Sequence, residues 1–522
     1  MEINEKLLSK KRIIVTIWIT VVFSAYILTK LFSVAADSEF YASVNLSSPK
    51  STVITVSYGD ILDRNLIPLV NREETYFAAI NPEKCCCEEL EQHIIDTEKY
   101  YSCIDGTALF LCEVDCPSIT DTLVIPVKQR YGSEGIAVHI IGYTDENGGV
   151  CGIEKEFDEQ LRQPKDTITL IYSTDATGNM LEGDGIRTVY TSNSTKDIVL
   201  SIDYEIQSAV EQAMSNVEKG AAVVLDIATG DIAAVVSKPT YDPNSPADSL
   251  DDKNSPFVNR AFSAYSVGSV FKLVIAGAAL EYGISDEFTY KCTGSVTVRE
   301  NEFSCHRFGG HGELDMRSAM VESCNPYFIC LGQNIPTDFL HDFAEKLGFG
   351  TSLQLWGEIQ SADGYLPTER ELLVPEEKAN FCFGQGMLTA TPLQVTLMTA
   401  AIANGGEMPS ARLIISDDND NCTYTRVMSK ETADKLKSFM ISTLYKDNSA
   451  AVPFSVTGGG KTSTAQTWTY DEYSNEKLNC WFSGFFPADN PKYAVTVVVE
   501  EGVSGNLTCG PIFKEIAEAV GS

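Results

Sequence analysis

One long stretch without charge stands apart from the rest of the chain. Ile13–Leu28 contains no charged residue, and the apolar character resumes after Lys30 as far as Ala36. About 20 apolar residues are enough to cross the hydrocarbon core of a bilayer, and Lys30 can extend its ammonium group to the interface. We therefore predict a transmembrane anchor at residues 13–36, preceded by a short tail at residues 1–12.

The charges that flank this stretch predict its orientation. Basic residues precede it and acidic residues follow it, namely Lys6, Lys10, Lys11 and Arg12 before, and Asp37 and Glu39 after. The positive-inside rule then places the tail in the cytoplasm and everything after residue 36 outside the cell membrane. A cleaved signal peptide, cut after Val34-Ala35-Ala36, is the alternative. The length of the stretch favours an uncleaved single-pass anchor.

Beyond the anchor, the pattern of apolar and polar residues changes near residue 194. Residues 37–193 are mixed, with short strand-like runs such as Thr52–Val56 and Ile136–Ile141 and no catalytic motif. We predict one domain there and a second domain at residues 194–522.

The second domain combines strands and helices. Ala221–Asp226 and Ile232–Ser237 predict a hairpin in which Gly230 takes the positive-φ position. Val270–Tyr282 is apolar nearly all round and is followed by Gly283, which predicts a buried helix. Further strands are expected at Val199–Ile202, Trp481–Phe486 and Tyr493–Glu500, and further helices at Gln207–Val217 and Ile512–Val520. Strands at both ends with helices between them indicate an α+β fold.

Composition narrows the class of protein. The 522 residues carry a formal net charge of -33, which would repel a polyphosphate backbone, so we expect no nucleic-acid partner. The 15 cysteines include the run Cys85–Cys87, whose spacing does not suit tetrahedral zinc. Cys292 and Cys305 are equally compatible with a disulfide and with two thiols. We expect no metal and no cofactor.

The start of the buried helix carries candidate chemistry. Ser269 and Lys272 lie three positions apart, hence on one face of a helix. A lysine in an apolar setting loses its charge more readily and can accept the serine proton. By itself this S-x-x-K pattern is weak, because the same four positions also describe a helix cap and a surface lysine.

Two later patterns strengthen this interpretation. Ser323-Cys324-Asn325 gives S-x-N and Lys461-Thr462-Ser463 resembles K-T-G, in the order found in serine acylases. Ser323 could relay a proton with Lys272, and the Asn325 amide could orient the lysine and the substrate.

Two other patterns fail. Gly458–Thr462 resembles a phosphate-binding loop, but Ser455 stands where that motif requires glycine. Asp417–Asn421 resembles a calcium loop, but Cys422 and Met428 replace its glycine and glutamate.

These motifs and several others resemble the class B penicillin-binding proteins, which are monofunctional peptidoglycan transpeptidases. The similarity covers most of the chain and runs in the family's order through Tyr58–Asn65, Gly152–Glu154 with Phe157-Asp158, Gly230–Ile232, Tyr241–Asn244, Asn259–Ala261, His311-Gly312, Gly384–Gly386, Thr391–Gln394, Ala403–Gly406 and Trp481–Phe485. The resemblance implies an N-terminal pedestal domain of the dimerisation type at residues 37–193. It also implies a transpeptidase domain at residues 194–522, with a five-stranded antiparallel sheet flanked by helices.

The resemblance also implies a serine acyl-enzyme mechanism with defined residues. Ser269, Lys272, Ser323 and Asn325 would be catalytic, and the backbone N–H groups of Ser269 and Thr464 would form the oxyanion hole. Lys461, Thr462, Ser463 and Thr464 would form the substrate-binding strand. The ligands implied are peptidoglycan stem peptides and β-lactams, and the partner implied is a polytopic glycan polymerase of the shape, elongation, division and sporulation family.

Departures from the family pattern keep alternatives open. Ser463 stands where glycine is usual and could crowd the substrate, and Tyr265–Gly268 lacks the proline that commonly stiffens this turn. A catalytically weak or silent structural partner of a polymerase is therefore one alternative. A D,D-carboxypeptidase or a β-lactamase on the same fold is another. The cellular role, in elongation, division or sporulation, stays open.

Overall fold

The structure is a computed structural model that describes residues 2–35, 48–82, 88–106, 108–133, 135–174, 180, 186–415 and 422–521. The cysteine run Cys85–Cys87 and the segment Asp417–Asn421 lie outside these residues, as does Ala36 of the predicted cleavage site. Contacts divide the chain into two compact units. The first comprises residues 1–58, 73–130 and 164–194, and the second comprises residues 59–72, 131–163 and 195–522.

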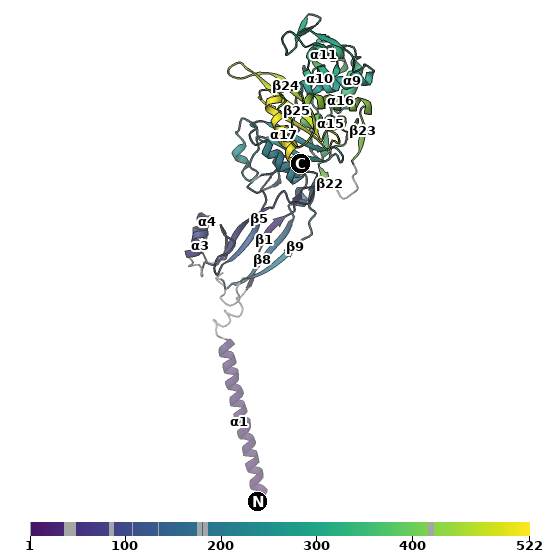
Figure 1. Cartoon of the computed structure of the whole chain (residues 1–522). Helices are drawn as coiled ribbons and strands as arrows, with labels where there is room; N and C mark the ends of the chain where they lie inside the picture. The colour runs from purple at the N-terminus through teal and green to yellow at the C-terminus, as the bar shows by residue number, and fades with distance from the viewer. Residues whose placement is uncertain are drawn as a thin grey trace. The chain divides into compact units, whose positions relative to one another are not determined.

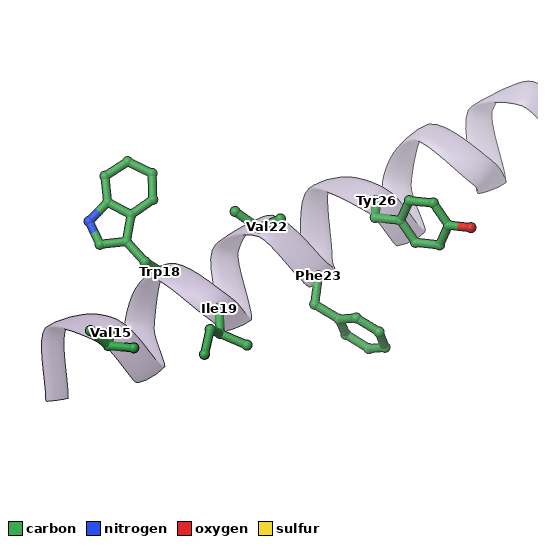
Figure 2. Close-up of a pocket in the computed structure, with 6 residues that line it drawn as sticks. All are labelled: Val15, Trp18, Ile19, Val22, Phe23 and Tyr26. Carbon is green, nitrogen blue, oxygen red and sulfur yellow. The ribbon is translucent and has the colours of Figure 1, made fainter. Parts of the chain in front are cut away.

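Helix α1 (Glu2–Ala35) contains residues 13–35 of the predicted anchor (Figure 1). Its segment Arg12–Ser33 has a mean hydropathy of 1.9 and is long enough to cross a membrane. Figure 2 shows the large side chains of this segment, which include Trp18, Phe23 and Tyr26. They are exposed to solvent in the isolated chain. The helix therefore fits a single membrane anchor.

The first unit also contains two three-stranded sheets. The strand orders are β1-β8-β9 and β4-β3-β5, and all pairs are antiparallel. Their bounds are β1 (Ser48–Tyr58), β3 (Glu73–Ile80), β4 (Phe110–Val114), β5 (Leu123–Gln129), β8 (Pro164–Thr174) and β9 (Arg187–Ser192), and helices α3 (Glu88–His93) and α4 (Thr97–Cys103) accompany them. The predicted strand Thr52–Val56 lies within β1.

The two units are interleaved along the chain. Residues 59–72 and 131–163, which the sequence assigns to the N-terminal domain, pack within the second unit. Strand β2 (Ile61–Leu62) pairs with β10 (Ile198–Leu200), which also pairs with β22 (Ile414–Ile415). The strand-like interpretation of Ile136–Ile141 is wrong, because α5 (Val138–Ile141) is a short buried helix. A short apolar run does not distinguish a strand from a buried helical turn.

The second unit is built on the predicted five-stranded antiparallel sheet. Its strand order is β12-β11-β26-β25-β24. The bounds are β11 (Gly220–Asp226), β12 (Ile232–Lys238), β24 (Gly459–Tyr470), β25 (Glu476–Phe486) and β26 (Tyr493–Glu500). Gly230 adopts a φ of 70° in the β11–β12 connection, as predicted. The α+β class and the transpeptidase-type sheet are confirmed.

Helices cover both faces of this sheet because its strands are apolar on both sides. Val223 of β11 and Trp481 of β25 join one core cluster, whereas their neighbours Val224 and Phe482 join another. Helices α8 (Tyr204–Ala213) and α17 (Gly510–Val520) pack on the second face, and α15 (Pro392–Ala403) and α16 (Lys430–Leu444) pack on the first (Figure 1).

A group of helices lies beside the first face of the sheet. It contains α9 (Lys272–Tyr282), α10 (Met316–Glu322), α11 (Asn325–Gln333), α12 (Thr337–Lys346), α13 (Glu369–Leu372) and α14 (Pro375–Phe381). The predicted buried helix begins as a 3₁₀ turn, η2 (Gly268–Phe271), and continues as α9. It ends at Gly283, whose φ of 96° is left-handed.

Candidate active site

Ser269 and Lys272 meet at the junction of η2 and α9. In a 3₁₀ turn, side chains three residues apart lie one above the other, and Lys272 Nζ lies 2.9 Å from Ser269 Oγ. Below this junction Phe271 packs against the rings of Phe349 and Phe381. Water does not solvate the amine of Lys272, because the residue is 0% exposed.

The S-x-N segment supplies the other neighbours of Lys272. Nζ lies 2.7 Å from the Ser323 carbonyl oxygen, 3.1 Å from Ser323 Oγ and 2.6 Å from Asn325 Oδ1. Ser323 ends α10 in a left-handed conformation, with a φ of 54°, and Asn325 begins α11. A non-glycine residue at this φ is unusual and marks a place where surrounding contacts determine the backbone.

Lys461 brings a second amine to the same point from strand β24. Its Nζ lies 3.1 Å from Ser323 Oγ and 2.9 Å from the Thr462 carbonyl oxygen. The Ser323 hydroxyl therefore lies between two lysine side chains. This arrangement can pass a proton from one amine to the other through a single hydroxyl group.

Burial controls the charge of both lysines. Desolvation, followed by repulsion from Lys461, lowers the pKa of Lys272 well below its usual range. Desolvation, followed by repulsion from Lys446, lowers the pKa of Lys461 to about 7. Among the residues that the structure describes, no carboxylate forms an ion pair with either amine. The site therefore favours a neutral lysine, which can act as a base.

The turn before Ser269 is tied to the rest of the site at consecutive backbone groups. The Trp481 indole donates to the Ser266 carbonyl oxygen at 2.9 Å. The Ser463 hydroxyl donates to the Val267 carbonyl oxygen at 2.8 Å, and the Gly268 N–H donates to the Gly384 carbonyl oxygen at 2.8 Å. These three bonds hold a turn that has no proline.

Ser463 therefore lies beside the nucleophile turn instead of projecting into open space. It is 2% exposed, and its hydroxyl contacts the backbone of that turn. The neighbouring residues of β24 differ, since Thr462 is half-buried and Thr464 is exposed. Thr464 Oγ1 accepts a bond from the Gly505 N–H at 3.1 Å.

Trp481 and Gly384 are site residues to which the sequence alone assigned no role. A Cβ at Gly384 would lie 2.1 Å from the Gly268 carbonyl oxygen, so only glycine fits under the nucleophile turn. Both residues belong to the family-like segments Gly384–Gly386 and Trp481–Phe485. Those segments were the only sequence signal for them, because their contacts span more than a hundred residues of chain.

Cys324, the middle residue of S-x-N, belongs to a cluster with Cys292, Cys305 and His311. One ligand-type atom from each of these four residues lies within 4.8 Å of the others. The described residues contain two other groups of this kind, which are more exposed: His93, Asp115 and Cys116, and His341, Asp342 and Glu345. The buried cluster has the ligand types of a soft metal site.

Comparison with known proteins agrees with this geometry. Residues 220–518 match the family model described as the penicillin binding protein transpeptidase domain. The chain is 29% identical over 394 residues to the stage V sporulation protein D of Bacillus subtilis (strain 168). That alignment covers 69% of this chain and 58% of the Bacillus protein.

A second relative and a solved structure cover more of their own lengths. The peptidoglycan D,D-transpeptidase FtsI of Buchnera aphidicola subsp. Baizongia pistaciae is 28% identical over 411 residues, which is 75% of this chain and 69% of that protein. The penicillin-binding protein PBP2 of Helicobacter pylori superposes with a TM-score of 0.70 at 22% identity, covering 90% of this chain and 99% of the other. The same Helicobacter protein in complex with MreC gives a TM-score of 0.66, again at 22% identity, covering 90% of this chain and 98% of the other.

Proposed function

The chain belongs to the penicillin-binding protein transpeptidase family, and from this membership we propose that it is a peptidoglycan D,D-transpeptidase that works through a serine acyl-enzyme. One observation carries the proposal. A fully buried lysine contacts a serine hydroxyl, a second serine hydroxyl and an asparagine amide at once, at 2.9, 3.1 and 2.6 Å.

In the acylation step, Lys272 would accept the proton of the Ser269 hydroxyl while Oγ attacks the penultimate D-Ala carbonyl carbon of a stem peptide. The bond to the terminal D-Ala breaks, and its nitrogen takes up a proton that the Ser323 hydroxyl can relay from the two lysines. Burial supports this role, because it lowers the pKa of Lys272 and so favours the neutral amine, which is the form that can accept a proton.

In the second step an amine of a neighbouring stem peptide would attack the ester carbonyl. The ester bond to Ser269 breaks, an amide cross-link forms, and the amine proton returns to the Ser269 oxygen through Lys272. Asn325, bonded to Lys272 at 2.6 Å, would hold the lysine in place in both steps.

Strand β24 would bind the substrate along its edge. We assign Lys461, Thr462 and Thr464 to the terminal carboxylate, and the backbone N–H groups of Ser269 and Thr464 to the developing oxyanion. The exposure of Thr464 and the half-burial of Thr462 support contact with a ligand. Ser463 lies deeper and contacts protein, so we assign it to the support of the site.

The membrane anchor supports a location at the cell membrane with the catalytic unit outside, because basic residues precede the apolar segment of helix α1 and acidic residues follow it. A polytopic glycan polymerase is the partner we expect, since no motif of glycan polymerisation was found between the anchor and residue 193. Helicobacter PBP2 has been solved in complex with MreC, and this complex supports a shape-complex role for this chain.

Covalent labelling of the full chain in detergent with a fluorescent penicillin tests the proposal. We expect one adduct per chain, mapped to Ser269 by mass spectrometry and absent from Ser269→Ala. The neighbouring Ser266→Ala variant is the matched control and should label normally. Folded protein that forms no adduct with several β-lactams would favour a silent structural partner, and a rapidly released adduct would favour a β-lactamase.

The acceptor distinguishes a transpeptidase from a D,D-carboxypeptidase. Stem peptide supplied with a second, amine-bearing stem should yield a cross-linked dimer. If only the hydrolysed peptide forms, the carboxypeptidase alternative replaces our proposal.

A further inference from the structure

Strands β24 and β25 extend past the candidate active site as a hairpin (Figure 1), and the tip of this hairpin, residues 467–476, carries exposed aromatic side chains. Trp468 is 68% exposed, Tyr470 is 58% exposed and Tyr473 is 78% exposed. In the described part of the chain, none of the three rings stacks on another aromatic ring or on a cation. Three aromatic faces are therefore available to a ligand on the same strand that carries Lys461 and Thr464.

The backbone at Trp468 adopts a conformation that a bulky residue rarely takes. Its φ is 57°, in the left-handed region. The pairing of the two strands shifts at this point, because Gln466 lies opposite Leu478 and Tyr470 lies opposite Glu476, so that β24 has two more residues than β25 between these pairs. Such bulges bend a strand, redirect a side chain and are frequent beside active sites.

Side chains of both strands hold the bulge in place. The Trp468 N–H donates to Glu476 Oε1 at 3.3 Å, and Gln466 Nε2 donates to the other oxygen of that carboxylate at 2.8 Å. The Thr467 hydroxyl donates to the Lys477 carbonyl oxygen at 2.6 Å. An unfavourable backbone that several contacts maintain is typical of functional segments. The indole is therefore presented from an ordered bulge.

The turn at the end of the hairpin is ordered as well. Asp471 Oδ1 accepts the backbone N–H of Tyr473 at 2.9 Å and that of Asn475 at 2.8 Å, and Asp471 Oδ2 accepts the Asn475 side-chain amide at 3.0 Å. A ring on an ordered turn loses less conformational entropy when it binds a ligand than a ring on a free loop.

The charges at the tip argue against an anionic ligand. Residues 467–476 contain Asp471, Glu472 and Glu476 and no lysine or arginine. This charge repels the phosphates of lipid headgroups. A sugar chain fits better, because the apolar C–H face of a sugar ring stacks on an aromatic ring and its hydroxyl groups donate hydrogen bonds to carboxylates.

The binding mode proposed for the stem peptide directs its sugar-bearing end toward this tip. The terminal carboxylate is assigned to the Lys461 and Thr462 end of the site, and the carbonyl under attack is assigned to the backbone N–H of Thr464. The rest of the stem peptide then runs along β24 toward higher residue numbers. Strand β24 is the edge strand of its sheet, which suits a peptide that adds alongside it.

The lengths of the stem peptide and of the hairpin agree. Thr464 lies opposite Cys480 and Tyr470 lies opposite Glu476, and this rise of four residues along β25 corresponds to about 14 Å. The roughly four stem residues between the attacked carbonyl and the sugar span at most about 14 Å when extended. The sugar therefore reaches the level of Tyr470 and the bulge.

We propose that Trp468, Tyr470 and Tyr473 bind the glycan strand to which the donor stem peptide is attached, an inference that rests on the proposed transpeptidase function. An amino-sugar ring would stack on the indole, and the tyrosine hydroxyls would bond to the hydroxyl or acetamido groups of neighbouring sugars. The hairpin would thereby select stem peptides carried on glycan over free stem peptides.

Kinetics with two substrates test this selectivity on the full chain in detergent. Trp468→Asn removes the indole and introduces a residue that tolerates the left-handed backbone. We expect its KM for a stem peptide carried on an oligosaccharide to rise by about 5-fold to 10-fold. The KM for the sugar-free stem peptide, kcat for both substrates and the rate of penicillin acylation should not change.

Two further variants control for the aromatic face and for the loss of an exposed ring. Trp468→Tyr keeps an aromatic face and should restore most of the selectivity. Tyr190→Ala is the matched control, because Tyr190 is 73% exposed on β9, which is also an edge strand, and it should change neither KM. If Trp468→Asn does not fold, Tyr473→Ala provides the same test from the turn.

Glycan binding can also be measured without catalysis. Glycan strands freed of stem peptides, mixed with the full-length Ser269→Ala protein, should show saturation transfer from the protein to the sugar protons in NMR. The double variant Ser269→Ala, Trp468→Asn should lose this signal. Vesicles of phosphatidylglycerol should not compete for the site.

Other results would overturn the proposal. An equal rise in KM for both substrates would assign Trp468 to the geometry of β24, and competition by the vesicles would assign the tip to lipid. Unchanged kinetics together with no saturation transfer would leave the three rings without a role in glycan binding. A chain that forms no adduct on Ser269 would contradict the proposed function, whereas glycan binding by Ser269→Ala requires no acylation, so the two failures are distinguishable.

Discussion

Two clusters of buried charge in the second unit are arranged in opposite ways. In the candidate active site, Lys272 and Lys461 are 0% and 1% exposed, and no described carboxylate pairs with them. At the β11–β12 connection, Asp231 is also 1% exposed, but Arg64 lies 3.2 Å from its carboxylate and Arg412 lies 2.6 Å away. The buried carboxylate of Asp231 is therefore paired with opposite charges, whereas the two buried lysines have no described counter-ion.

This difference separates a structural site from a chemical one. A buried carboxylate between two guanidinium groups satisfies its charge and joins segments distant in sequence. Buried amines without counter-ions destabilise the fold unless they shed their protons, and that tendency is useful to a base. The ion pairs of Asp231 with Arg64 and Arg412 therefore fit a structural role for the family-like segments that contain Arg64 and Asp231.

Replacement of Lys272 should have the largest effect on chemistry. In Lys272→Met the base is lost while the volume is roughly kept, so we expect the second-order rate of penicillin acylation to fall by about 10³-fold or more. Stability should be unchanged or higher, because no buried cation has to be neutralised. Stopped-flow labelling and urea unfolding of the same preparation measure both quantities.

A Lys272→Met variant whose acylation rate stayed within a few fold of wild type would contradict the assignment of Lys272 as the base. A large loss of stability would do so as well, because it would assign Lys272 to the framework of the fold.

Removal of the carboxylate from the neutralised cluster should give the opposite result. Asp231→Ala leaves Arg64 and Arg412 without their shared partner, and we expect a loss of about 3 kcal/mol in the free energy of unfolding. We take this low figure because the two arginine side chains are 23% and 24% exposed. Acylation by the folded fraction should keep its rate constant. A normal urea midpoint would show that the cluster is not structural.

The low pKa of Lys461 should make the stability of the fold depend on pH. Its pKa is about 7 in the folded chain and about 10.4 when unfolded, so the unfolded state holds one more proton between these values. Stability therefore rises with pH through this window, by at most about 1.4 kcal/mol per pH unit from this group. Below pH 7 the full cost of the buried charge is present.

Lys461→Met removes this contribution, so the difference in unfolding free energy between variant and wild type should shrink as the pH rises from about 7 to about 10. Urea titrations at a series of pH values measure it. A difference independent of pH would mean that Lys461 keeps its charge when folded, through a counter-ion that enters the site.

Sequence reasoning predicted the elements that depend on local pattern. The strand Tyr493–Glu500 and the end of α9 at Gly283 follow from apolar runs and a glycine stop. It could not predict contacts between distant segments, such as the interleaving of residues 59–72 with the second unit. The Ser269, Ser323 and Lys461 motifs were visible as linear patterns, whereas the Ser463 contact to Val267 spans 196 residues.

Replacement of Ser463 should have the smallest effect on acylation, but the two interpretations of this residue predict changes of opposite sign. If its side chain crowded the substrate, as its place in the motif suggests, Ser463→Gly would speed acylation. The structure instead gives its hydroxyl a bond to the Val267 carbonyl oxygen, one of three bonds that hold the nucleophile turn. A bond of this kind contributes about 0.5–1.5 kcal/mol, so we expect Ser463→Gly to slow acylation by about 2-fold to 10-fold.

Ser463→Ala separates the hydroxyl from the Cβ. Because Ala keeps the Cβ and lacks only the hydroxyl, a loss similar to that of Ser463→Gly would assign the effect to the bond with Val267. If Ser463→Gly speeds acylation and Ser463→Ala does not, the Cβ of residue 463 obstructs the substrate, and serine at this position lowers activity. Because this turn lacks the stiffening proline, the bonded arrangement is the one we expect. A slower Ala variant that loses no more than about 0.5–1.5 kcal/mol of unfolding free energy is the result that supports it.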